Sequence, residues 1–145
     1  MICWDRLGDD VVIGVLEGGE PAALRDLFTR VRDLVAPEHA ATSTDPALAR
    51  ILQVRRAREH GEPPLWPDDE VFDTARTMLD LALSTIPDEG AVAVLPSFNH
   101  VFAWLWAITD VTAASPRDAR WLGDVARALH ATASAERAHR VDHFW

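Results

Sequence analysis

The stretch FNHVFAWLWAITD, residues 98–110, constrains the fold more than any other part of the chain. At 100° per residue, its apolar side chains cover nearly the whole circumference of a helix. One broad face holds Phe98, Val101, Phe102, Leu105, Ile108 and Thr109. A soluble helix that is apolar nearly all round lies at the centre of a bundle. We therefore expect residues 98–113 to form the central helix of the domain.

Asp110 is the exception in this helix, because a buried carboxylate must be paired or hydrogen-bonded. Two interpretations are open. In the structural one, Asp110 binds an arginine, a helix N-terminus or a tryptophan indole N–H. In the functional one, it is the carboxylate of a site. We favour the structural interpretation, since buried ion pairs are often structural.

The rest of the chain predicts a mainly α fold of the α+β class. Residues 2–16 have the β-formers of a hairpin around the turn at Gly8-Asp9-Asp10, and residues 91–95 are a candidate third strand. Apolar residues spaced three and four apart predict helices after Pro21, after Asp45, from Asp68 and from Ser115. The region 38–46 is expected to be a loop. We expect one domain, 1–145, with the N-terminal β-hairpin packed on a bundle of about five helices.

Composition and charge exclude several functions. The formal net charge is −9, and all 14 basic residues apart from histidine are arginine. A nucleic-acid-binding face needs net positive charge, so we expect no nucleic-acid partner. Pro96, Asn99, His100 and Asp110 interrupt the longest apolar region, so we expect no membrane span. A single cysteine and charges in the first ten residues favour a cytoplasmic protein.

Catalytic and cofactor motifs are absent from the sequence. It has neither GxSxG nor a glycine-rich phosphate loop, so we expect no enzyme activity. The best metal candidates are Glu136, His139 and His143, which share one face if the last helix continues that far. They lack the HExxH order, and histidines in a last helical turn also suit the helix dipole. We therefore expect no metal and no cofactor.

Two features concern a protein partner. The cluster RRAR at 55–58, together with Arg50, is the one basic cluster. It could contact RNA, DNA or an acidic protein surface, but we favour a solvated helix face because the chain as a whole is acidic. Trp66 stands in the proline-rich connector GEPPLWP, and Phe144 and Trp145 end the chain. These three aromatic residues either pack onto the core or are offered to a partner. Tryptophan is enriched at binding hot spots, so they are the candidate interaction residues.

Two motifs carry a resemblance to a known family. Trp104-Leu105-x-Ala107-Ile108-Thr109-Asp110-Val111 resembles the W-L-x-A-L-N-D-L signature of a small, uncharacterised actinobacterial family. The segment 45–52, DPALARIL, is similar to that family's D-P-A-L-x-R-L segment. The family continues its signature with R-L-x-L-G, whereas this chain has Thr112-Ala113-Ala114. The arginine that could pair with Asp110 within one helical turn is therefore missing, and the partner of Asp110 must come from elsewhere in the chain. The family's genes often lie near the gene for the Clp-protease adaptor, which implies a cytoplasmic, regulatory or adaptor-like protein.

Three functions are compatible with these observations. The first is a non-enzymatic regulatory or adaptor-like module that binds a protein, with a homodimer left open. The second is a helical domain that binds a small molecule or metal through Asp110, His100 or His139 and His143. The third is an acidic inhibitor or immunity-type protein that masks a basic partner, whose association would depend strongly on salt.

Overall fold

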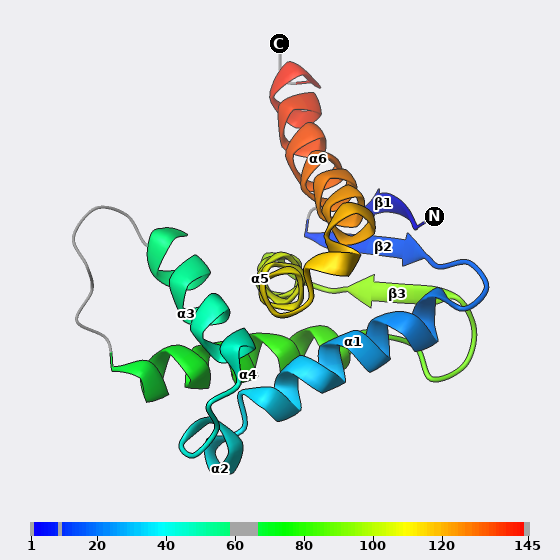
Figure 1. Cartoon of the computed structure of the whole chain (residues 1–145). Helices are drawn as coiled ribbons and strands as arrows, with labels where there is room; N and C mark the ends of the chain where they lie inside the picture. Colours follow the sequence, from blue (N-terminus) through cyan, green and yellow to red (C-terminus); the bar gives the residue numbers. More distant parts are fainter. Residues whose placement is uncertain (1, 9, 59–66, 144–145) are drawn as a thin grey trace.

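The computed structural model describes residues 2–8, 10–58 and 67–143, with side chains as far as Ser134. The described chain forms a mainly helical α+β fold with a three-stranded antiparallel sheet (Figure 1). The strands are β1 (Cys3–Leu7), β2 (Val11–Val15) and β3 (Val92–Leu95). The helices are α1 (Glu20–Leu34), α2 (Pro37–Ala40), α3 (Pro46–Arg58), α4 (Asp68–Leu83), α5 (Phe98–Ala114) and α6 (Ala119–His143), with a 3₁₀ turn at Pro116–Asp118. This confirms the predicted fold class.

The sheet has the order β1-β2-β3, so the predicted hairpin and third strand are both present. Gly8 has a φ of +80°, which the tight β1–β2 turn requires and which glycine adopts without a side-chain clash. Trp4, Gly14 and Ala93 are paired across the three strands on the face that packs on the helices. The opposite face exposes apolar side chains, namely Leu7, Val15, Val92 and Val94.

Gly14 allows the Trp4 ring to pack closely against β2. A Cβ added at Gly14 would lie 2.5 Å from the Trp4 ring, closer than real Cβ contacts. We expect Gly14→Ala to lower the free energy of unfolding by about 1–3 kcal/mol, because the ring must move within a packed core. Chemical denaturation followed by circular dichroism measures this. Gly19→Ala is the control, since a Cβ there meets nothing within 4 Å, and an equal loss in both variants would contradict the prediction.

Local signals set most helix boundaries. Pro21 lies in the first turn of α1, and the Asp45 side chain accepts a hydrogen bond from the Ala47 N–H at the start of α3. The prediction of a loop at 38–46 is partly wrong, because Pro37–Ala40 forms the short helix α2. In α6 the buried apolar stripe contains Leu122, Val125 and Leu129, whereas the neighbouring Trp121 is only half-buried.

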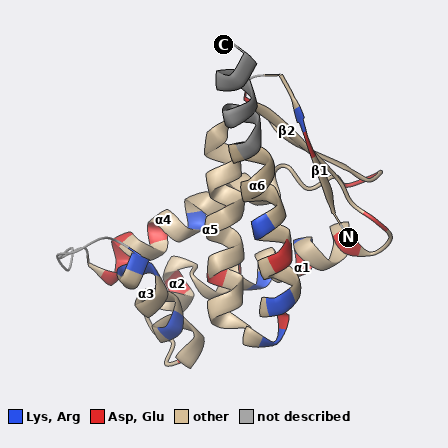
Figure 2. Ribbon diagram, turned by 90° about the horizontal axis from the view of Figure 1, so that it is seen from above, with Lys and Arg blue, Asp and Glu red and all other residues tan. Residues whose placement is uncertain are grey.

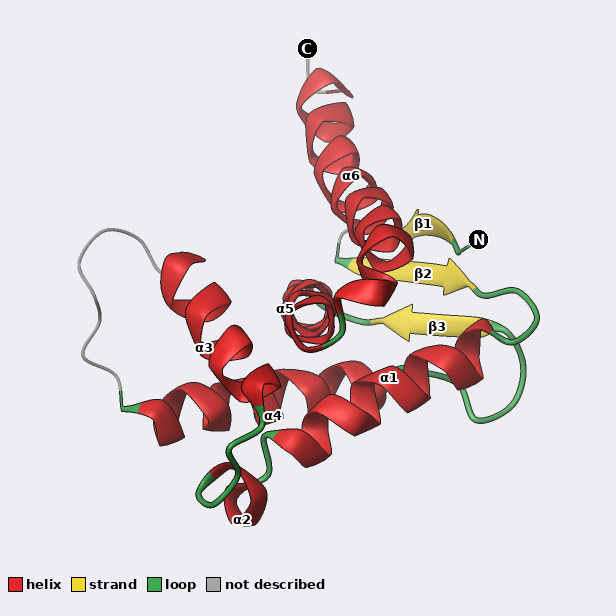
Figure 3. Ribbon diagram, in the orientation of Figure 1, coloured by secondary structure: helices red, strands yellow, loops and turns green. Residues whose placement is uncertain are grey.

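Helix α5 is the central helix, as predicted. Figure 3 shows it end-on with α3, α4, α6 and the sheet arranged around it, and α4 packs against it most extensively. Figure 2 shows it as an almost uncharged helix between elements that carry the charged residues. Its core side contains Val101, Ala103, Trp104, Ala107, Ile108, Asp110 and Val111. Burial is not complete all round, however, because Phe102 is 57% exposed and Leu105 and Thr109 are half-buried.

Candidate functional site

Asp110 lies in the core and is paired with Arg55 of α3. The Arg55 Nε donates to Asp110 Oδ1 at 2.8 Å, and Nη2 donates to Oδ2 at 2.7 Å. The two side chains are 4% and 1% exposed. Two parallel charge-assisted hydrogen bonds are the strongest arrangement for an arginine and a carboxylate. The interior of the domain therefore contains a complete ion pair and not an open carboxylate site.

Two opposing effects act on the Asp110 carboxyl. Burial raises the pKa of Asp110, because the charged form loses its hydration, and the hydrogen bonds and positive charge of Arg55 oppose this rise. The Arg55 guanidinium also lies over the Trp106 ring, 4.7 Å from its centroid. Trp106 is half-buried, so its indole contacts the Arg55 guanidinium while part of the indole remains accessible to solvent.

Helix α3 is fixed to α5 at two points. Besides the Arg55–Asp110 pair, Arg50 Nε donates to the Ala113 carbonyl at 2.8 Å and Nη2 donates to the Ala114 carbonyl at 3.0 Å. These carbonyls belong to the last turn of α5, where a cation satisfies unpaired acceptors and suits the helix dipole. The two contacts set the position of α3 relative to α5, and with it the width of the space beside α3.

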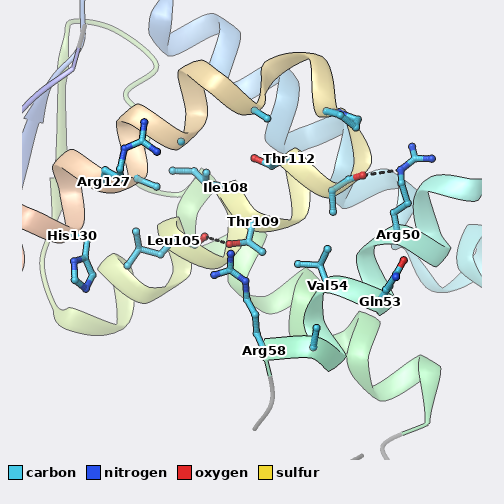
Figure 4. Close-up of a pocket in the computed structure, with 16 residues that line it drawn as sticks. Arg50, Gln53, Val54, Arg58, Leu105, Ile108, Thr109, Thr112, Arg127 and His130 are labelled. Carbon is cyan, nitrogen blue, oxygen red and sulfur yellow. Dashed lines mark hydrogen bonds between the residues drawn. The ribbon is translucent and has the colours of Figure 1, made fainter.

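That space is a groove whose floor is α5 and whose walls are α3 and α6 (Figure 4). Its volume is about 900 Å³. The floor is formed by Leu105, Ile108, Thr109, Thr112 and Ala113. We call this the α3–α5–α6 groove. It lies over the side of α5 that neither neighbouring helix covers.

The ionisable residues that line the groove are all arginine or histidine. Arg50 and Arg58 stand on the α3 wall, and Arg127 and His130 stand on the α6 wall. No carboxylate lines the groove among the described residues, although the chain carries a net charge of −9. Arg127 is partly neutralised by an ion pair with Asp124, whereas no hydrogen bond or ion pair of Arg58 is found within the described part of the chain. The groove is therefore a local basic site on an acidic protein.

A shallower hollow continues the groove toward the start of α5. It is lined by Ala57, Arg58, Phe102, Leu105, Trp106 and Thr109. Four of these residues, namely Ala57, Arg58, Leu105 and Thr109, also line the groove. Phe102 and Trp106 thus add two aromatic side chains to the same surface.

The three candidate interaction residues, Trp66, Phe144 and Trp145, lie outside the described residues. The same holds for the side chains of Glu136, His139 and His143. Elsewhere in the described chain, no group of three His, Cys, Asp or Glu residues is placed to hold a metal ion. His100 interacts with Ser97 through Nδ1 and Oγ, 2.8 Å apart, at the start of α5. The structure does not bring His100 and Asp110 together.

The interpretation of RRAR as a solvated helix face is wrong for Arg55, which is buried. A sequence signal for this exists. Arg55 follows Leu48 by seven residues and Ile51 by four, which puts it on the buried stripe of α3. The groove itself had no such signal, because Arg58 and Arg127 belong to helices that are far apart in the sequence.

Comparison with known proteins identifies the family of this chain and nothing about its architecture. The chain is a mainly helical α+β domain with a closed internal ion pair and an open groove. A family model described as a domain of unknown function (DUF2017) matches residues 1–115, so the chain belongs to that family. The match extends from β1 to the end of α5 and includes one wall and the floor of the groove. No curated protein and no solved structure matches the chain. No helix among the described residues has the length and apolar character needed to cross a membrane.

Proposed function

We propose that this protein is a non-enzymatic interaction module that binds a segment of a protein partner in the α3–α5–α6 groove. The observation that carries the proposal is the uncovered side of α5. An apolar helix at the centre of a bundle normally has neighbours on all sides, yet within the described residues Phe102 is exposed and Leu105 and Thr109 are only half-buried. Exposed apolar surface bordered by polar side chains is typical of interaction sites.

The composition of the surface supports a protein partner. Trp106 and Arg58 border the groove, and tryptophan and arginine are the residue types most enriched at binding hot spots. The ion pair beneath Trp106 holds the floor and the α3 wall in place, and a preformed surface lowers the cost of ordering on binding.

A regulatory or adaptor-like role in the cytoplasm is the setting that we propose for this module. The resemblance to the family whose genes lie near the Clp-protease adaptor gene supports such a role. The exposed Cys3 suits a reducing compartment.

Blocking the groove tests the proposal. Thr109 lies at the centre of the floor, so Thr109→Trp fills the groove without adding charge. Chemical cross-linking in the host cells, followed by purification and mass spectrometry, should recover a partner with the wild type and about tenfold less of it with Thr109→Trp. The matched control is Val94→Trp on the outer sheet face, where Val94 is exposed, and it should recover the partner as the wild type does.

Two results would contradict the proposal. One is the recovery of the same partner in equal amount by Thr109→Trp. The other is a native mass spectrum of the gently purified protein that shows a bound small molecule lost on Thr109→Trp. The second result would favour a ligand-binding domain, since the groove volume of about 900 Å³ also suits a drug-sized molecule.

A further inference from the structure

The shape of the groove indicates what kind of segment it receives. The uncovered side of α5 runs from Phe102 to Ala113 and follows the spacings of three and four that mark one face of a helix. At 1.5 Å per residue this surface is about 16 Å long, which corresponds to about three helical turns.

The walls admit a helix better than an extended strand. Both walls and the floor are helices, so the groove presents no sheet edge with which a strand could pair. The α6 wall is lined by the small residues Ala119, Gly123 and Ala126, at spacings of four and three, and Ala57 faces them from α3. A Cβ on Gly123 would meet only the Arg127 guanidinium, so space is open above the wall. Small residues allow helix backbones to approach closely.

The charges of the groove select the sign of the charge on the partner segment. Figure 4 shows Arg58, Arg127 and His130 near the Leu105–Thr109 part of the floor, with Arg50 at the other end. An occupant with basic side chains would face three arginines and no carboxylate among the lining residues. Acidic side chains would instead pair with Arg58 on one wall and Arg127 on the other.

We propose that the occupant is an acidic amphipathic helix of about three turns from a protein partner, whose apolar stripe packs on Leu105, Thr109 and Thr112 while its carboxylates face Arg58 and Arg127. This inference rests on the proposed function, because it identifies the partner segment for the same groove. The apolar contact buries the apolar stripe of the partner helix. The arginines select a helix with negative charge and fix its position along the groove.

A peptide-display selection tests the inference. The probe is a library of helical peptides of about fourteen residues in which apolar and charged positions vary independently, with acidic, neutral and basic members in equal numbers. Selection on the wild-type protein, with counter-selection on Thr109→Trp, recovers peptides that need the open groove. We expect acidic peptides with apolar residues at i, i+3 or i+4, and i+7 to be enriched.

Charge reversal then locates the contacts. We expect Arg58→Glu to weaken binding of the recovered peptide about tenfold or more, and Arg127→Glu to weaken it less, since Asp124 already pairs with Arg127. The matched control is Arg30→Glu on α1, which lines no part of the groove and should leave binding unchanged. Raising the salt concentration from about 0.05 to 0.5 M should weaken binding several-fold. Circular dichroism of each variant verifies folding.

Two results would overturn this inference. Enrichment of basic or non-helical peptides that still fail to bind Thr109→Trp would overturn the acidic helix and leave the proposed function standing. Peptides that bind the wild type and Thr109→Trp equally would contradict the groove as a binding site, and with it both proposals.

Discussion

Removing either partner of the buried ion pair should destabilise the fold strongly. We expect Arg55→Met and Asp110→Ala each to lower the free energy of unfolding by about 3–5 kcal/mol, because each leaves the other charge buried without a counter-charge. Arg55 and Asp110 are almost fully buried and their hydrogen bonds are bidentate, so no solvent is available to replace the lost partner. Urea denaturation followed by circular dichroism measures the effect.

The double variant Arg55→Met with Asp110→Leu is the control for this prediction. It replaces both charges with apolar side chains, and we expect it to be close to the wild type in stability or above it. The double-mutant cycle should therefore be strongly non-additive. Additive losses in the double variant would show that the two charges do not depend on each other.

The pH dependence of Arg55→Met follows from the direction of the Asp110 pKa. Burial raises the pKa of Asp110 above its unfolded value of about 3.9, and Arg55→Met removes the cation that opposes the rise. Stability from a raised carboxyl pKa is fully present below the unfolded value and is lost as the pH rises through the folded value. The free energy of unfolding of Arg55→Met should thus lie further below that of the wild type at about pH 8 than at about pH 5. A difference in the free energy of unfolding that does not change with pH would contradict a raised pKa of Asp110 in this variant.

The fold could be predicted where local chemistry determines it. The hairpin and β3 follow from β-formers bounded by turn residues, and the cap at Asp45 follows from the residue types at a helix start. Helix α2 was missed, because a four-residue helix is too short to show a periodic apolar pattern.

The candidate site could be predicted only in part. The sequence identified Asp110 as a residue that needs a partner. It did not indicate which residue that partner is, and the segment 50–58 alone contains several arginines. The uncovered side of α5 could not be predicted, because a helix that is apolar all round does not indicate which face remains open. That face is decided by where α3 and α6 lie on α5, which is a property of tertiary packing.

Trp104 is the other residue whose loss should have a large effect. It is completely buried, and its indole N–H donates to Thr85 Oγ1 at 2.7 Å. Its ring makes edge-to-face contacts with Trp4, at a centroid distance of 5.3 Å, and with Phe28, at 5.4 Å. We expect Trp104→Ala to lower the free energy of unfolding by about 3–5 kcal/mol, because it leaves a large cavity where α1, β1 and α5 meet.

Two further variants make this prediction testable even if Trp104→Ala does not fold. Trp104→Phe keeps an aromatic ring but loses the hydrogen bond, and we expect a smaller loss of about 1–3 kcal/mol. Trp121→Ala is the control for the residue type, since Trp121 is only half-buried and should cost less than Trp104→Ala. An equal loss in the free energy of unfolding for Trp104→Ala and Trp121→Ala would contradict the prediction that the buried contacts of Trp104 stabilise the fold.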